Sequence, residues 1–170
     1  MGATHFCVND GTPLERREIE GRLLEACPNC AFVLWRDPKL VTMVIVSGPE
    51  GVLLGRRGIE PGYGAWCLPG GFVNDDEHPA DSALRECLEE VRASVSISRL
   101  VGLYHIRKTA APSMVAIAYE ATLEPGALPE AGEEMLEVRF FPPDELPELA
   151  FPSHREAMTD WLRSGEGIPS

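Results

Sequence analysis

The sequence lacks several features that would assign it to broad classes of protein. No apolar run approaches the roughly 20 residues that a membrane-spanning helix needs. The first ten residues contain no basic stretch followed by an apolar one, so no secretory signal is expected. Positive charge is also scarce, since 15 Lys and Arg face 27 Asp and Glu and the formal net charge is −12. We therefore expect a cytoplasmic protein that binds neither membranes nor nucleic acid, because binding nucleic acid requires a basic surface.

Cysteine is also sparse, and this argues against a disulfide framework. There are five cysteines, an odd number, in a chain that is not a short secreted domain. Cys27 and Cys30 nevertheless form a CxxC pair, which is typical of metal binding.

The pattern of polar and apolar residues divides the chain into two parts. Residues 1–36 carry too few large apolar residues for a core of their own, so a metal or packing on the main domain must stabilise them. Residues 37–170 form the main domain, in which strands outnumber well-separated helices, so we predict an α+β fold with a mixed sheet. The expected strands are 40–47, 52–54, 95–103, 113–123 and 138–141, and the expected helices are 79–91 and 152–164. Ser153 is the expected N-cap of the second helix, with Glu156 completing a capping box.

Three carboxylates share one face of the first predicted helix. Glu86 and Glu90 are four residues apart, and Glu89 lies beside them, while the apolar residues of this helix (Ala80, Ala83, Leu84, Cys87, Leu88 and Val91) point the other way. Like charges at these spacings repel, and a bound divalent cation would relieve the repulsion. Hard cations such as Mg²⁺ take oxygen ligands. A solvated acidic helix face is the plain alternative for such a run.

The spacing of the surrounding residues favours the metal site. Gly71 is followed after five residues by Glu77, and after seven more by Arg85, with Glu86, Glu89 and Glu90 in step. This pattern resembles the Nudix box. The resemblance implies an α/β/α sandwich that hydrolyses a nucleoside diphosphate derivative with Mg²⁺ or Mn²⁺.

The resemblance also implies a role for each residue of the box. Glu86 and Glu90 would be the main metal ligands, Glu89 a further ligand or base, and the Gly70 carbonyl a backbone ligand. Glu77 and Arg85 would organise the loop and the helix. The box expects glycine where Arg92 stands, and Arg in a left-handed conformation costs roughly 1 kcal/mol. This departure leaves every predicted metal ligand in place.

The N-terminal cysteines resemble the zinc ribbon that one Nudix subgroup carries. Cys7, Cys27 and Cys30 match the spacing, but Asp10 stands where the second cysteine is expected. A Cys₃Asp site for structural Zn²⁺ is expected, with His5 as a competing fourth ligand. A ribbon that holds no metal is the alternative.

Several other residues are candidates for binding substrate. Trp66 and Phe72 could stack on a base, although core packing explains Trp66 equally well. Arg56 or Arg57 could contact a phosphate of the substrate, and of the two we predict Arg56. We also predict that Gly71, in the loop before the helix, binds substrate. Either Glu133 or Glu134, in a loop after the box, could act as a further ligand or base, and we predict Glu134. A solvated loop charge is the plain alternative for each.

The predicted function is hydrolysis of a small nucleotide derivative. The subgroup resemblance favours ADP-ribose or FAD, whereas NADH is disfavoured because the Ser-Gln-Pro-Trp-Pro-Phe-Pro-x-Ser run of the NADH-hydrolysing subgroup is absent. A non-catalytic nucleotide sensor is the alternative. The sequence does not determine the oligomeric state, and the resemblance allows a homodimer.

Overall fold

The computed structural model describes residues 4–107 and 113–165. The chain separates into two compact units, residues 1–37 and 38–170. The outer ends of the two predicted domains, residues 1–3 and 166–170, lie outside the described residues. Within the described parts of the chain, no helix is both long enough and apolar enough to cross a membrane.

The first unit is a small antiparallel sheet preceded by a cysteine-bearing loop. Its strands are β1 (Glu15–Ile19), β2 (Arg22–Ala26) and β3 (Val33–Leu34), in the order β1-β2-β3. Glu20 and Gly21 join β1 to β2, and both have positive φ angles, of 51° and 73°. Two successive residues of this kind form the tight turn that matches the twist of a hairpin.

The second unit is built on a mixed sheet. Its strands are β4 (Lys39–Gly48), β5 (Gly51–Arg57), β6 (Trp66–Cys67), β7 (Val95–Ile106), β8 (Met114–Leu123) and β9 (Met135–Phe141). The order is β6-β5-β4-β8-β7, and β9 pairs with β5. The pairing of β4 with β8 is parallel, and the other pairings are antiparallel.

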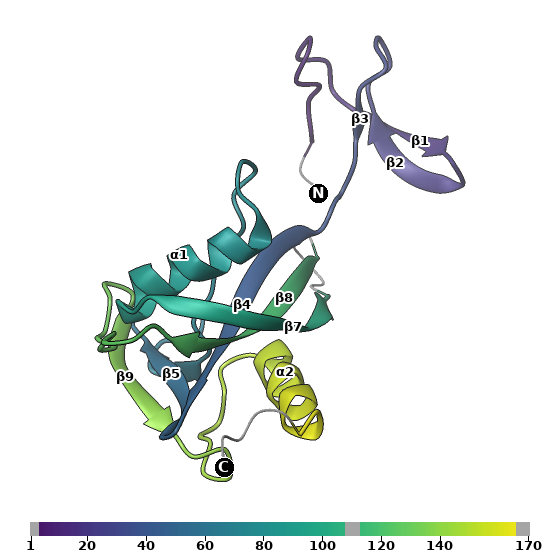
Figure 1. The fold of residues 1–170 in the computed structure, drawn as a ribbon. Helices are drawn as coiled ribbons and strands as arrows, with labels where there is room; N and C mark the ends of the chain where they lie inside the picture. Colours follow the sequence, from purple (N-terminus) through teal and green to yellow (C-terminus); the bar gives the residue numbers. More distant parts are fainter. Residues whose placement is uncertain (1–3, 108–112, 166–170) are drawn as a thin grey trace. The chain divides into compact units, whose positions relative to one another are not determined.

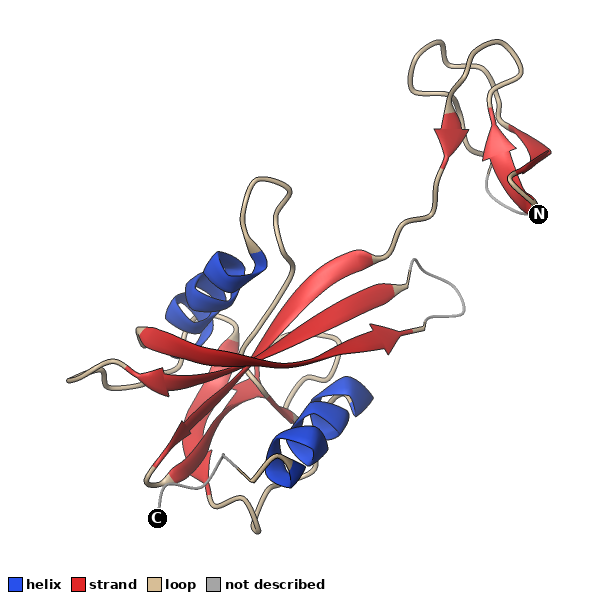
Figure 2. Ribbon diagram, turned by 45° about the vertical axis from the view of Figure 1, so that its right-hand side comes forward, coloured by secondary structure: helices blue, strands red, loops and turns tan. Residues whose placement is uncertain are grey.

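The sheet lies between two helices, as Figures 1 and 2 show. Successive side chains of β4 point to opposite faces. Met43 and Ile45 join the core under α2 (Pro152–Arg163), and Val44 and Val46 join the core under α1 (Pro79–Val91). This arrangement confirms the predicted α+β class with a mixed sheet.

Helix α1 begins and ends where the sequence predicted, but its apolar face is narrower. Ala83, Cys87 and Val91 are fully buried, whereas Leu84 and Leu88 are 38% and 57% exposed. The prediction that both leucines face the core is wrong, because they lie on the flanks of the helix. Arg92 ends the helix with φ 49° and ψ 30°, in the left-handed conformation that glycine would adopt more readily.

Helix α2 begins differently from the prediction. Phe151, not Ser153, is the N-cap, and no side chain caps the helix. Pro152 occupies the first helical position, where its fixed φ angle and missing N–H suit a helix start. Ser153 is therefore inside the helix and is buried. Further along, Trp161 donates a hydrogen bond of 2.8 Å to the carboxylate of Glu120 on β8, which anchors α2 to the sheet.

Candidate active site

The loop before α1 runs in an extended conformation along β4. The N–H groups of Val44 and Thr42 donate hydrogen bonds of 2.8 Å to the carbonyls of Pro69 and Gly71. Because an extended chain alternates the direction of its polar groups, the N–H and carbonyl of Gly70 face away from β4. The Gly70 N–H donates to Glu90 Oε2 at 2.8 Å. The Gly70 carbonyl accepts no hydrogen bond from the described residues.

Gly71 allows the helix carboxylates to approach this backbone. A Cβ atom at residue 71 would lie 2.4 Å from Glu86 Oε1, closer than non-bonded atoms tolerate. Glycine at this position therefore lets the Glu86 carboxylate lie directly against the loop. The predicted role of Gly71 in binding substrate stays a prediction.

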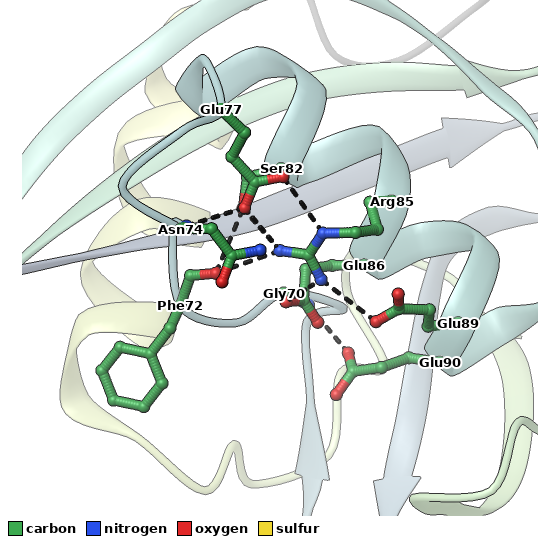
Figure 3. Close-up of polar contacts among 9 residues, drawn as sticks. All are labelled: Gly70, Phe72, Asn74, Glu77, Ser82, Arg85, Glu86, Glu89 and Glu90. Atoms are coloured by element: carbon green, nitrogen blue, oxygen red, sulfur yellow. Dashed lines mark hydrogen bonds and ion pairs between the residues drawn. The ribbon is translucent and has the colours of Figure 1, made fainter.

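Arg85 is the centre of the polar network between loop and helix, which Figure 3 shows. Its Nε and Nη2 donate to the two oxygens of Glu77 at 3.1 and 2.7 Å, a bidentate pair. Its Nη1 donates to Glu86 at 2.8 Å and to Glu89 at 3.1 Å, and Nη2 also donates to the Phe72 carbonyl at 3.1 Å. One guanidinium thus binds three carboxylates and the loop backbone.

The carboxylates of this network differ in electrostatic environment. The hydrogen bonds from Arg85 lower the pKa of Glu77 to about 2. Burial raises the pKa of Glu90 to about 8, although the Gly70 N–H opposes the shift, and the neighbouring charge of Glu86 adds to it. Burial also raises the pKa of Glu86, against the effect of Arg85. The carboxylates of Glu86 and Glu90 are therefore held close together at a cost in electrostatic free energy, which a bound cation would offset.

The donor set suits a hard divalent cation. Glu86, Glu89 and Glu90 supply carboxylate oxygens, and Gly70 supplies a carbonyl without a hydrogen-bond donor among the described residues. Mg²⁺ and Mn²⁺ prefer such oxygen ligands. The residues present thus fit the metal that the sequence predicted, and their roles as ligands stay a prediction.

These groups open into a cavity of about 1280 Å³. Its wall includes Glu86, Glu89 and Glu90, together with Glu133 and Glu134 from the loop before β9. The negative charge of Glu134 contributes to the raised pKa of Glu90 and of Glu86, which places its carboxylate near theirs. A cavity of this size has room for a dinucleotide-like ligand.

Phe72 supplies an aromatic surface at the cavity. Its ring lines the cavity and is 53% exposed, with the ammonium group of Lys39 located 5.2 Å from the ring centroid. An exposed ring of this kind can stack on a flat heterocycle. The prediction of Phe72 as a substrate-binding residue is therefore compatible with its position.

Two other predicted substrate-binding residues do not lie on this cavity. Arg56 donates to the Gly64 carbonyl at 3.0 Å and lies 3.8 Å from Glu137. Trp66 is partly buried and packs edge-to-face on Phe141, at 4.8 Å between ring centroids, against the core. Consecutive strand residues face opposite sides, and the cavity is lined by Arg57, the neighbour of Arg56. The roles of Arg56 and Trp66 in binding substrate stay predictions.

Sequence reasoning also missed His154. This residue of the first turn of α2 lines the cavity, and its Nδ1 accepts a hydrogen bond of 3.1 Å from the Leu68 N–H. Burial lowers the pKa of His154 to about 4, and the charges of Arg57 and Arg155 act in the same direction. No local sequence signal marks it, since its partner is 86 residues away.

The first unit contains a separate cluster that could hold a metal. One ligand atom from each of Cys7, Asp10, Cys27 and Cys30 lies within 4.8 Å of the others. The Sγ atoms of Cys7 and Cys30 are 3.6 Å apart, and Cys27 Sγ is 3.6 Å from Asp10 Oδ2. A tetrahedral zinc site with Zn–S bonds of about 2.3 Å has S···S separations of about 3.8 Å, so the donors fit. His5 is not part of the cluster, because its ring bonds to Glu25 at 2.9 Å.

Comparisons with known proteins agree with this geometry. The profile of the NUDIX domain matches residues 37–162. The ADP-ribose pyrophosphatase of Methanocaldococcus jannaschii is 29% identical over 137 residues, which cover 80% of each chain. The oxidized purine nucleoside triphosphate hydrolase of Mus musculus is 32% identical over 64% of this chain and 69% of its own. The crystal structure of a NUDIX hydrolase from Nitrosomonas europaea superimposes with a TM-score of 0.81 at 31% identity, over 97% of this chain and 94% of that one.

Proposed function

The chain belongs to the NUDIX family, and from this premise we propose that it hydrolyses the diphosphate linkage of a nucleoside diphosphate derivative of the ADP-ribose class. The observation that carries the proposal is the convergence of Glu86, Glu89, Glu90 and the Gly70 carbonyl on one cavity. Such a set of hard donors beside a large open cavity suits a cation that bridges protein carboxylates and substrate phosphates.

The proposed division of work follows from the positions of the side chains. When bound, Mg²⁺ or Mn²⁺ screens the phosphate charge and lowers the pKa of a coordinated water. Glu86 and Glu90 would hold the cation, and Arg85 fixes the carboxylates of Glu77, Glu86 and Glu89. Two carboxylates are candidates for accepting a proton from the attacking water: Glu89, which is half exposed, and Glu134, on the loop before β9.

The substrate class rests on one relative and on the cavity. The archaeal relative is named as an ADP-ribose pyrophosphatase. The cavity of about 1280 Å³ exceeds what a single nucleotide fills, and the exposed ring of Phe72 offers a surface for stacking a base. FAD has the same diphosphate linkage between two large groups and stays a second compound of this class.

The test is hydrolysis by the purified full-length chain with Mg²⁺ or Mn²⁺. ADP-ribose, FAD, NADH, diadenosine polyphosphates and nucleoside triphosphates would be compared by measuring released nucleoside monophosphate and pyrophosphate. We expect AMP from ADP-ribose, and a loss of roughly 1,000-fold in Glu90→Gln, since a catalytic metal contributes several kcal/mol. Arg56→Ala is a matched control at a residue outside the cavity.

Two results would contradict the proposal. Turnover of nucleoside triphosphates alone would move the substrate class toward that named for the murine relative. Nucleotide binding with no cleavage of any compound would favour a sensor, in which the same carboxylates hold a metal and a ligand without turnover.

We further propose that the Cys7, Asp10, Cys27 and Cys30 cluster holds one structural Zn²⁺. Four ligands close a tetrahedral site and leave no position for substrate, so the metal would stabilise the first unit. The backbone N–H of Phe32 and the Asn9 side chain lower the pKa of Cys30, which favours its thiolate, whereas burial raises the pKa of Cys7 to about 11. This unit has too few large apolar residues to form a stable core, so a bound zinc ion would supply the missing stability.

Zinc content after purification tests this site. We expect one Zn²⁺ per chain in the wild type and in Asp10→Cys, much weaker retention in Asp10→Ala, and loss in Cys27→Ser. His5→Ala is the control, because His5 pairs with Glu25 outside the cluster, and it should retain zinc. A wild-type chain that binds no zinc, or loss of zinc in His5→Ala alone, would refute the assignment.

A further inference from the structure

The hydrogen bond between Leu68 and His154 connects α2 to the loop that carries Gly70. The Leu68 N–H donates to His154 Nδ1 at 3.1 Å, and Leu68 itself is 1% exposed. Without His154 this N–H would be a buried donor with no partner among the described residues, since the nearby bonds to β4 are made by the carbonyls of Pro69 and Gly71. A donor of this kind without a partner destabilises the conformation that buries it.

The direction of this bond fixes the chemical form of the histidine. A backbone N–H can only donate, so Nδ1 must accept, and the single ring proton of neutral His154 is on Nε2. The neutral form agrees with the low pKa that burial and Arg57 give the ring. The ring also contacts Phe151 edge-to-face, with centroids 5.1 Å apart, and the guanidinium of Arg57 lies 5.1 Å from the Phe151 ring.

Helix α2, which carries His154, is attached to the sheet by polar contacts. Trp161, further along α2, is fully buried and bonds to Glu120. The Tyr104 hydroxyl donates to Asp160 at 3.1 Å, a second link between α2 and the sheet. Two independent polar contacts thus attach α2 to the sheet, and the helix in turn positions the imidazole against the loop that carries Leu68 and Gly70.

We propose that His154 is a positioning residue for two of the predicted metal ligands, the Gly70 carbonyl and the Glu90 carboxylate. By accepting a hydrogen bond from the Leu68 N–H, His154 fixes the backbone from Leu68 to Gly70. This backbone in turn sets the position of the Gly70 N–H and carbonyl, which face Glu90. The inference rests on the proposed metal-dependent function. Leu68 is two residues from Gly70, and the intervening Pro69 has a fixed φ angle. A displacement of the Leu68 peptide group is therefore expected to displace the Gly70 N–H and carbonyl as well.

Two substitutions of similar polarity separate this role from simple packing. The side-chain oxygen of His154→Asn can occupy the place of Nδ1 and accept the Leu68 N–H. The amide of His154→Gln instead reaches the place of Nε2 and leaves Leu68 without an acceptor. Phe151→Leu is the control, because it removes the neighbouring ring and leaves the hydrogen bond intact.

The readout is Mn²⁺ affinity of the full-length chain without substrate, measured by the electron paramagnetic resonance of free Mn²⁺. We expect the dissociation constant to rise about tenfold or more in His154→Gln, the size typical for residues that orient metal ligands. His154→Asn and Phe151→Leu should stay within about threefold of the wild type. Hydrogen exchange of the Gly70 amide in metal-free protein should be faster in His154→Gln alone.

The outcomes distinguish this inference from the proposed function. Equal Mn²⁺ affinity in the Asn and Gln variants, or a wild type that binds no Mn²⁺, overturns the positioning role. If the wild type hydrolyses no nucleotide but binds Mn²⁺ in a manner that depends on His154 as described, the proposed hydrolysis fails while the positioning role stands.

Discussion

The backbone N–H of Gly132 donates a hydrogen bond of 2.8 Å to the carbonyl of Glu90, at the end of α1. The N–H of Glu130 likewise bonds to the carbonyl of Val91 at 3.0 Å. The last carbonyls of a helix have no partner within it, so this loop caps α1 from a distance in sequence. The same contact brings Glu133 and Glu134 to the cavity that Glu90 lines.

Gly132→Ala tests how closely this loop must approach the helix. A Cβ at residue 132 would lie 1.9 Å from the Glu89 carbonyl oxygen, so the backbone must move. We expect a loss of roughly 1–3 kcal/mol in the free energy of unfolding, measured by urea denaturation, together with reduced turnover. Gly48→Ala is the control, because its nearest neighbour would be 4.0 Å away. Equal stability of both variants would show that the loop does not need this approach.

Arg56 and Arg57 form a natural matched pair. Arg57 lines the cavity and makes no ion pair with a carboxylate within the described parts of the chain. Arg56 lies outside the cavity, where it donates a hydrogen bond to the Gly64 carbonyl and forms an ion pair with Glu137. A charged hydrogen bond to a substrate phosphate contributes about 1.5–3 kcal/mol. We expect Arg57→Ala to lower kcat/KM roughly 10- to 100-fold and Arg56→Ala to change it little. A larger effect at Arg56 would place the phosphate elsewhere.

The left-handed conformation of Arg92 offers a stabilising substitution. Arg92→Gly removes the clash between Cβ and the backbone that a φ angle of 49° imposes. We expect the free energy of unfolding to rise by up to about 1 kcal/mol, seen as a higher melting temperature. Arg92→Ala controls for loss of the side chain, because alanine keeps the strained Cβ and should bring no gain. A lower melting temperature in Arg92→Gly than in Arg92→Ala would contradict this account.

The buried imidazole of His154 predicts an acid-sensitive component of stability. Its pKa is about 4 in the folded protein and about 6.5 when exposed in the unfolded chain. The unfolded state therefore takes up a proton first as the pH falls, so the contribution is complete above pH 6.5 and is lost toward pH 4. Between pH 7 and pH 5 this amounts to roughly 2 kcal/mol.

The comparison with His154→Asn isolates this component. The variant has no titrating group at this position, so its free energy of unfolding, from urea denaturation, should fall less between pH 7 and pH 5. Parallel losses in the two proteins would show that His154 is not held neutral in the folded state.

Sequence alone determined those features that depend on short spacings along the chain. Helix α1 and its row of carboxylates follow from intervals of three and four residues, which a helix places on one face. The family pattern likewise joins Gly71 to Glu90 over twenty residues, and the profile match confirms the family. The α+β class followed from the number and order of apolar segments, and the sheet confirms it.

Only the tertiary structure decided features that depend on strand register and long-range packing. Which of Arg56 and Arg57 faces the cavity depends on the pairing of β5, because one residue of shift exchanges the two faces of a strand. The exposure of Leu84 and Leu88 depends on how α1 rests on the sheet. The bond from Leu68 to His154 spans 86 residues, and the bond from Gly132 to Glu90 spans a strand pair. Such contacts arise only when the sheet has brought distant segments together, so no local pattern records them.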